Sequence, residues 1–197
     1  MKFSFSRYKL ALALSAGLLL AACGGGKATF DIKGEIQGVQ YTGLVLTNVK
    51  NGDTLAVPVG ATTFKFAKNV EYGEEYDVQI LNNANPLHQT CQVFNGKDTA
   101  GRLATISIGV SCILNERFLG GKVSGLTTDG LILTNGSDEQ LPIAKGATTF
   151  TFGRPLAFGA SYGVTILKQP AGNLCTLSNG VGTMGDVAID TITVSCL

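Results

Sequence analysis

The stretch "GEIQGVQYTGLVLTN" at residues 34–48 decides the fold, because the chain contains it twice. It returns without a gap as "GKVSGLTTDGLILTN" at residues 121–135. In both copies, short runs with alternating apolar residues lie between glycines, a pattern typical of strands joined by turns. A strand pattern repeated at a distance of 87 positions predicts two tandem all-β units.

The segments that follow repeat in the same order, and the offset between the copies shrinks only from 87 to 84 positions. The matched pairs are "GATTFKF" (60–66) with "GATTFTF" (146–152), "VEYGEEYDVQIL" (70–81) with "LAFGASYGVTIL" (156–167), and "TISIGVSC" (105–112) with "DTITVSC" (190–196). The three lost positions fall in loops. We therefore predict one domain at residues 30–112, a linker at 113–118 and a second domain at 119–197.

Each copy is expected to form seven strands, because period-two alternation of β-branched and aromatic residues recurs between Gly and Asn turns. No segment after Ala22 has a helical period. In the first copy the alternating residues are Phe30, Ile32 and Ile36; Leu44 and Leu46; Leu55, Val57 and Val59; Phe64 and Phe66; Tyr76, Val78 and Ile80; Cys91 and Val93; and Ile106, Ile108, Val110 and Cys112. Seven short strands per copy predict two tandem β-sandwiches.

One part of the repeat has a more specific pattern: F-x-F, a hydrophobic residue, and then G-x-x-Y-x-V-x-I. It resembles the second half of prealbumin-like sandwiches, of the transthyretin-like or Cna-B type, and the whole repeat is similar to tandem sandwich units of uncharacterised bacterial envelope lipoproteins. The resemblance implies a seven-stranded prealbumin-like or Ig-like sandwich and no activity. The residues that carry it are Phe64, Phe66, Val70, Gly73, Tyr76, Val78 and Ile80, and Phe150, Phe152, Leu156, Gly159, Tyr162, Val164 and Ile166.

The N-terminus has the organisation of a secretory signal. Residues 1–9, "MKFSFSRYK", carry three positive charges, and residues 10–20 are uncharged and mostly apolar. A transmembrane helix is the competing interpretation. The apolar stretch from Leu10 to Ala22 has thirteen residues, short of the roughly 20 that a membrane-spanning helix needs.

The signal ends in "LAAC" at residues 20–23, which resembles the lipobox of bacterial lipoproteins. The resemblance implies a signal peptide of residues 1–22, cleavage before Cys23, and lipid, including palmitate, on that cysteine. Residues 23–29 would then form a tether containing three glycines. In enteric-type bacteria an Asp after the lipidated cysteine favours the inner membrane. Gly24 stands there in this chain, which favours the outer membrane.

An ordinary secretory signal cut after Ala22, leaving a free Cys23, is the alternative to lipidation. The other four cysteines form two pairs, Cys91 with Cys112 and Cys175 with Cys196, each separated by 21 positions and equivalent between the copies. Export and repetition predict one disulfide in each domain. Zinc is the rival interpretation, but the spacing is not C-x-x-C, and His88 has no counterpart in the second copy.

Several motifs that suggest chemistry have simpler interpretations. "GVGTMG" (180–185) fits the dinucleotide-binding G-x-G-x-x-G, but a strand pattern follows it instead of a helix. His88 is expected to be a solvated loop residue and no general base. The acidic cluster of Glu74, Glu75 and Asp77 has no acidic counterpart in the second copy, so no shared calcium or glycosidase site is expected.

Aromatic residues Tyr72, Tyr76, Phe158 and Tyr162 could form a carbohydrate or peptide platform. Alternation places Tyr76 and Tyr162 in the core instead, on strands shared with Val78 and Val164. Without its N-terminal charges the chain has 12 basic and 14 acidic residues. It has no basic stripe that would indicate nucleic-acid binding.

Together these patterns predict a lipid-anchored cell-envelope protein with a structural, display or protein-interaction role. We expect no catalytic residue, cofactor or metal site, and so no enzyme. The partners would be the membrane, through lipid on Cys23, and an envelope protein or surface ligand. The alternative is a lipoprotein that binds a carbohydrate, peptide or metal through loops that differ between the copies, "NNANPLHQT" (82–90) or "KNGDT" (50–54).

Overall fold

The computed structural model describes residues 26–137 and 139–197. Every regular element in this part of the chain is a strand, apart from one 3-10 turn, η1 (Leu81–Asn83). No helix there is long and apolar enough to cross a membrane. The predicted signal peptide and Cys23 lie outside the described residues.

The first repeat folds into a sandwich of two four-stranded sheets, in the orders β5-β2-β10-β8 and β4-β3-β7-β9. The two-stranded pair β1-β6 completes it. Neighbouring strands run antiparallel except β2 and β10, which are parallel. The strands are β1 (Thr29–Phe30), β2 (Lys33–Gln37), β3 (Val45–Asn48), β4 (Asp53–Ala56), β5 (Thr63–Lys65), β6 (Val70–Glu71), β7 (Glu75–Ile80), β8 (Gln89–Phe94), β9 (Lys97–Thr99) and β10 (Ile108–Leu114).

The second repeat has the same topology with every strand number raised by ten. Its sheets have the orders β15-β12-β20-β18 and β14-β13-β17-β19, with the pair β11-β16, and β12 and β20 are parallel. The fold is therefore all-β with two sandwiches, as the repeat predicts. The strands are β11 (Glu116–Arg117), β12 (Leu119–Ser124), β13 (Leu131–Asn135), β14 (Glu139–Ile143), β15 (Thr149–Thr151), β16 (Leu156–Ala157), β17 (Ser161–Lys168), β18 (Cys175–Ser178), β19 (Val181–Thr183) and β20 (Ile189–Cys196).

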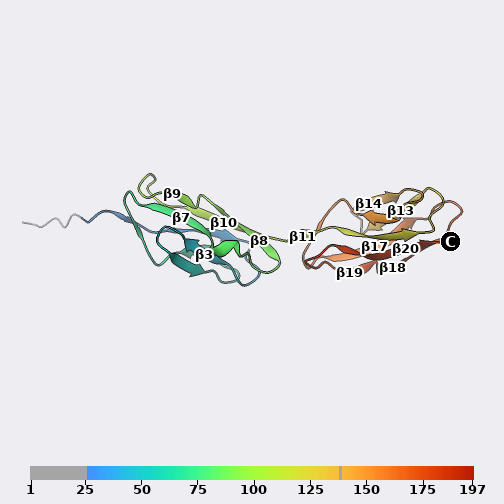
Figure 1. Ribbon diagram of the computed structural model, residues 1–197, viewed down its shortest axis with the longest axis horizontal. Helices are drawn as coiled ribbons and strands as arrows, with labels where there is room; N and C mark the ends of the chain where they lie inside the picture. The colour runs from blue at the N-terminus through green and yellow to red at the C-terminus, as the bar shows by residue number, and fades with distance from the viewer. Residues whose placement is uncertain (1–25, 138) are drawn as a thin grey trace, which may run out of the picture.

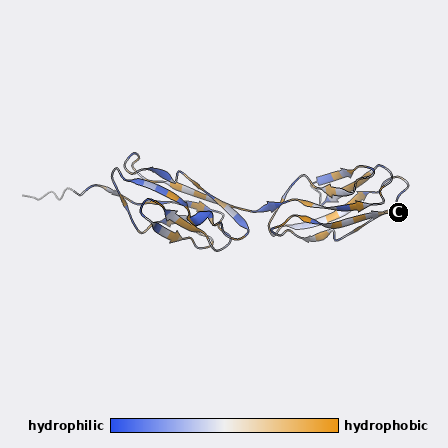
Figure 2. Ribbon diagram, in the orientation of Figure 1, coloured by the Kyte–Doolittle hydropathy of each residue, from blue (hydrophilic) through white to orange (hydrophobic). Residues whose placement is uncertain are grey.

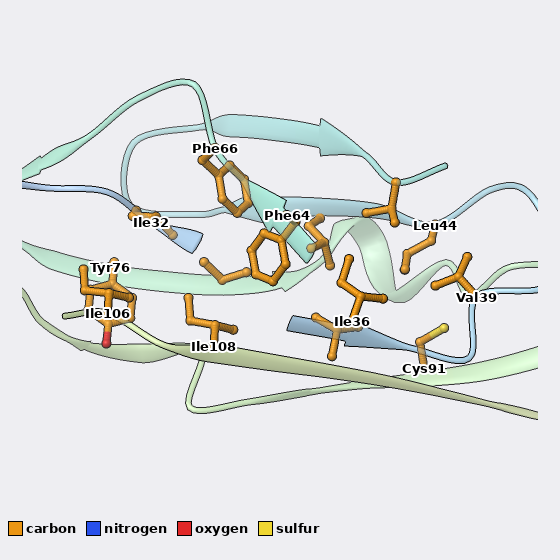
Figure 3. Packing of buried hydrophobic residues seen from close by; sticks show 14 of the residues in the cluster. Ile32, Ile36, Val39, Leu44, Phe64, Phe66, Tyr76, Cys91, Ile106 and Ile108 are labelled. Carbon is orange, nitrogen blue, oxygen red and sulfur yellow. The ribbon is translucent and has the colours of Figure 1, made fainter. Parts of the chain in front are cut away.

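Each sandwich has its own hydrophobic core between its two sheets. In the first core the rings of Phe64 and Phe66 meet edge to face, 6.0 Å apart, among Ile32, Ile36 and Ile108 (Figure 3). The equivalent rings in the second sandwich repeat this contact at 6.0 Å. Apolar and polar segments alternate along many strands (Figure 2), which leaves polar faces toward solvent. Burying each large apolar side chain contributes about 1.5–3 kcal/mol.

The two sandwiches lie end to end, and the predicted linker between them is mostly strand (Figure 1). Strand β10 continues through Leu114 and pairs with β8 as far as Gln89. Strand β11 begins at Glu116 and pairs with β16 of the second sandwich. Asn115 is the single residue between β10 and β11, so the connection contains little free chain.

Candidate functional site at the junction of the two sandwiches

Both disulfides join neighbouring strands within one sheet. Cys91 on β8 is bonded to Cys112 on β10, and Cys175 on β18 is bonded to Cys196 on β20. In each sandwich the two cysteines are cross-strand partners in the antiparallel register. The structure therefore contains the intradomain pairing that the repeat predicts, and this pairing leaves none of these four cysteines available as a zinc ligand.

The glycine-rich motif at residues 180–185 is part of a sheet edge. It contains the short strand β19, which pairs with β17, and its counterpart in the first sandwich contains β9. The segment that follows is strand β20, so the motif lacks the helix N-terminus on which a dinucleotide pyrophosphate would bind.

The acidic residues of β7 are engaged in pairs with lysines. Glu75 bonds to Lys50, and this hydrogen bond and ion pair lower the pKa of Glu75 and raise the pKa of Lys50. Asp77 lies 3.8 Å from the ammonium of Lys97. Among the residues that the structure describes, no group of three or more His, Cys, Asp or Glu side chains is arranged to hold a metal.

The four aromatic residues considered as a platform do not share a surface. Tyr76 and Tyr162 are buried in the two cores, as alternation predicts, and burial raises the pKa of Tyr76. Tyr72 is 60% exposed at its position after β6 of the first sandwich. Phe158 is its counterpart in the second sandwich; it is half-buried and its ring contacts His88 and Tyr41 of the first sandwich.

His88 corrects the expectation of a solvated loop residue, because it lies against the second sandwich. Its ring stacks on Phe158 with centroids 3.7 Å apart and an angle of 7° between the planes. Its Nδ1 atom is 2.7 Å from a carboxylate oxygen of Asp186, 98 positions away. Tyr41 closes the cluster, with its ring edge-on to His88 at 4.9 Å and to Phe158 at 5.8 Å.

The first sandwich positions its part of this cluster through Gln89, the residue after His88. Gln89 is buried, and its Oε1 accepts hydrogen bonds from the backbone amides of Gln40 and Tyr41 at 2.8 and 3.0 Å. Its Nε2 donates to the carbonyl of Gly38. The buried amide therefore fixes the loop between β2 and β3 that carries Tyr41, since a buried polar group requires such partners.

Asn115 connects the two sides of the junction through its backbone. Its amide donates to the carbonyl of His88 at 2.8 Å, and its carbonyl accepts from the amide of Phe158 at 2.8 Å. Its side chain accepts from the hydroxyl of Thr90 at 2.8 Å. The residue between β10 and β11 is thus hydrogen-bonded to both sandwiches.

Arg117 on β11 supports the loop that carries Asp186. Its Nε donates to the backbone carbonyl of Asp186 at 2.7 Å, and its Nη1 donates to the carbonyl of Glu116. This junction contains aromatic rings, an imidazole–carboxylate pair and backbone hydrogen bonds. These contacts join residues of the two sandwiches.

The loops considered for ligand binding have different surroundings. Residues 82–90 contain the end of η1, His88 and the start of β8, so this loop belongs to the junction. Residues 50–54 contain the turn between β3 and β4 and the start of β4, where the side chain of Asn51 accepts a hydrogen bond from the amide of Asp53.

Sequence reasoning missed the junction because its residues are specific to one copy each. The second sandwich has Thr128 and Gly172 at the positions equivalent to Tyr41 and His88, and the first has Tyr72 and Arg102 at those of Phe158 and Asp186. One sequence signal could have indicated the junction: these four positions carry different types of residue in two otherwise similar copies.

No protein family and no curated protein matches the sequence. Among solved structures, two major pilin proteins of Streptococcus pyogenes are similar at a TM-score of 0.29. For pilin T3.2 of serotype GAS13637 the identity is 10%, and the match covers 87% of this chain and 98% of the pilin. For pilin T-13 of serotype GAS131465 the identity is 12%, with 87% and 97% covered. A TM-score this low carries no conclusion about family or function.

Proposed function

We propose that this chain is a lipid-anchored cell-envelope protein with a structural, display or protein-interaction role and no catalytic activity. The observation that carries the proposal is the end-to-end arrangement of the sandwiches: the chain enters the first at one end of the molecule and leaves the second at the other (Figure 1). Such an arrangement suits a spacer that holds its C-terminal end away from an anchor.

The anchor in this proposal is lipid on Cys23. Strand β1 begins at Thr29, six positions further along the chain. Six extended residues reach about 20 Å, so the first sandwich would stay close to the lipid surface while the second projects beyond it. Two or more acyl chains on one cysteine would make the anchoring stable.

Metabolic labelling with a palmitate analogue tests the anchor directly. Cells that express the whole chain are expected to give a labelled mature protein in the membrane fraction, with the label lost in Cys23→Ser. Mass spectrometry should find cleavage before Cys23. An unmodified mature cysteine would contradict the proposal.

Membrane fractionation tests the location. The wild-type chain should sediment with outer membranes, whereas Gly24→Asp, which introduces the inner-membrane retention residue of enteric-type bacteria, should move it to inner membranes in such a host. Wild-type protein found in inner membranes would contradict the proposed location and leave the anchor itself supported by the labelling.

A further inference from the structure

We propose that Tyr41, His88, Phe158 and Asp186 form a latch that keeps the two sandwiches docked. This inference concerns the docking of two domains of one chain. It is independent of the lipid on Cys23 and stands whether or not the chain is anchored.

The ring contacts supply the neutral part of the latch. His88 and Phe158 stack in parallel at 3.7 Å across the boundary, and Tyr41 contacts both rings edge-on. Offset and edge-to-face aromatic pairs are favourable beyond the area they bury. All three rings are half-buried, and separation of the sandwiches would break the contacts between them.

The imidazole–carboxylate pair supplies the second part. Nδ1 of His88 lies 2.7 Å from a carboxylate oxygen of Asp186, which belongs to the second sandwich. A hydrogen bond to a carboxylate is stronger than one between two neutral groups, so this contact adds to the ring stack.

Arg117 on β11 holds the loop that carries Asp186. Its guanidinium donates to the backbone carbonyls of Asp186 and Glu116, which keeps the carboxylate of Asp186 beside the imidazole of His88.

The backbone at His88 gives an independent reason to assign a role to this side chain. Its φ is +64°, in the left-handed region that glycine adopts most easily, and the second sandwich has Gly172 there with a φ of +74°. A side chain kept at a position where the other copy uses glycine indicates a purpose other than folding the loop.

The free ends of the molecule lack the complementary set. Thr128 and Gly172 replace Tyr41 and His88 on the outer end of the second sandwich, and Tyr72 and Arg102 replace Phe158 and Asp186 on the first. Arg102 bonds to Asp98 within its own sandwich. The stack and the imidazole–carboxylate pair therefore form only at the central junction.

Hydrogen–deuterium exchange of the purified mature protein tests the latch. The amide of Asn115 donates to the carbonyl of His88, and the amide of Phe158 donates to the carbonyl of Asn115, so both lie at the junction and report its local opening. Phe158→Ala is expected to raise the open population about tenfold, and with it the exchange of both amides. His88→Gly should act in the same direction without strain, because it copies the residue of the second sandwich. Tyr72→Ala, at the free end, is the matched control and should leave both amides unchanged.

The imidazole–carboxylate contact is tested with Asp186→Ala, which removes the partner of His88 Nδ1 and should also raise the exchange of both amides. Exchange at Asn115 and Phe158 that stays at the wild-type level in His88→Gly and in Phe158→Ala would overturn the latch. Exchange that rises in those two variants and stays at the wild-type level in Asp186→Ala would overturn the contribution of the carboxylate.

Discussion

Cys91 lies directly opposite Cys112 in the antiparallel register of β8 and β10, with Cα atoms 4.0 Å apart. The disulfide therefore fastens two strands that are already hydrogen-bonded in one sheet, and it closes a loop containing β9. The second sandwich repeats the arrangement with Cys175 and Cys196. Each disulfide therefore stabilises the sandwich that contains it.

Removal of one disulfide should destabilise only its own sandwich. Closing a loop of about 20 residues contributes roughly 3 kcal/mol by the chain-entropy estimate, so Cys91→Ala with Cys112→Ala should lower the melting temperature of the first sandwich. Calorimetry would then show two separated transitions. Cys175→Ala with Cys196→Ala is the equivalent variant of the second sandwich, and it should lower the melting temperature of that sandwich. A midpoint unchanged under oxidising conditions would contradict this expectation.

Gly34 should not tolerate a methyl group. An alanine Cβ at this position would lie 1.8 Å from the carbonyl oxygen of Ile108 and 2.8 Å from the ring of Phe64. Neither the strand backbone nor the buried ring can move away cheaply, so Gly34→Ala should cost at least about 2 kcal/mol in urea unfolding. Gly163→Ala, also in a strand, meets no atom within 4 Å and should stay near wild type.

The Lys50–Glu75 pair should make the first sandwich sensitive to acid. The bond to Lys50 lowers the folded-state pKa of Glu75 below 4.5, its ordinary value. Its stabilising contribution is therefore fully present above pH 4.5 and is lost as the pH falls through the lower folded-state value.

Lys50→Met removes that partner, so it should return the pKa of Glu75 toward its ordinary value. NMR titration of the side-chain carboxyl carbon would measure the shift. The Asp31–Lys65 pair, which lowers the pKa of Asp31, is the internal control because Lys50→Met should leave it unchanged. A Glu75 titration identical in the two proteins would rule out Lys50 as the cause.

Gln89 should matter more than its counterpart Asn173. Gln89→Ala removes two acceptor bonds and one donor bond from a buried loop, and it should lower the stability of the first sandwich by about 2–3 kcal/mol. It should also loosen Tyr41 and accelerate exchange at Asn115. Asn173 accepts bonds from the hydroxyls of Thr127 and Thr128, which water can replace, so Asn173→Ala should have a smaller effect in denaturant melts. Equal losses of stability in Gln89→Ala and Asn173→Ala would contradict this prediction.

Alternation along the chain predicted the strands that pack directly against a core. Tyr76 and Val78 on β7 point inward as expected, because a buried face requires a period of two. Strands β6 and β9 escaped prediction because two or three residues are too few to show a period. Both exist through pairing with partners distant in sequence, β1 and β7.

The junction could not be derived from local pattern, because its contacts join residues far apart in the chain. His88 and Asp186 are 98 positions apart, and the sequence around either residue does not indicate a contact with the other. The same applies to residues 113–118, which look like a linker because they lie between repeats. Their strand pairing depends on β8 on one side and β16 on the other.

The parallel pairing of β2 with β10, and of β12 with β20, has a mechanical consequence. In each sandwich the first strand of the pair lies near the N-terminal end of the domain's sequence and the second lies near its C-terminal end. A chain held at its N-terminus and pulled at its C-terminus would drag the two strands past each other lengthwise. The hydrogen bonds between two strands sheared in this way share the load and must fail together, instead of opening one after another. In each sandwich this parallel strand pair would therefore be the part that resists tension along the molecule.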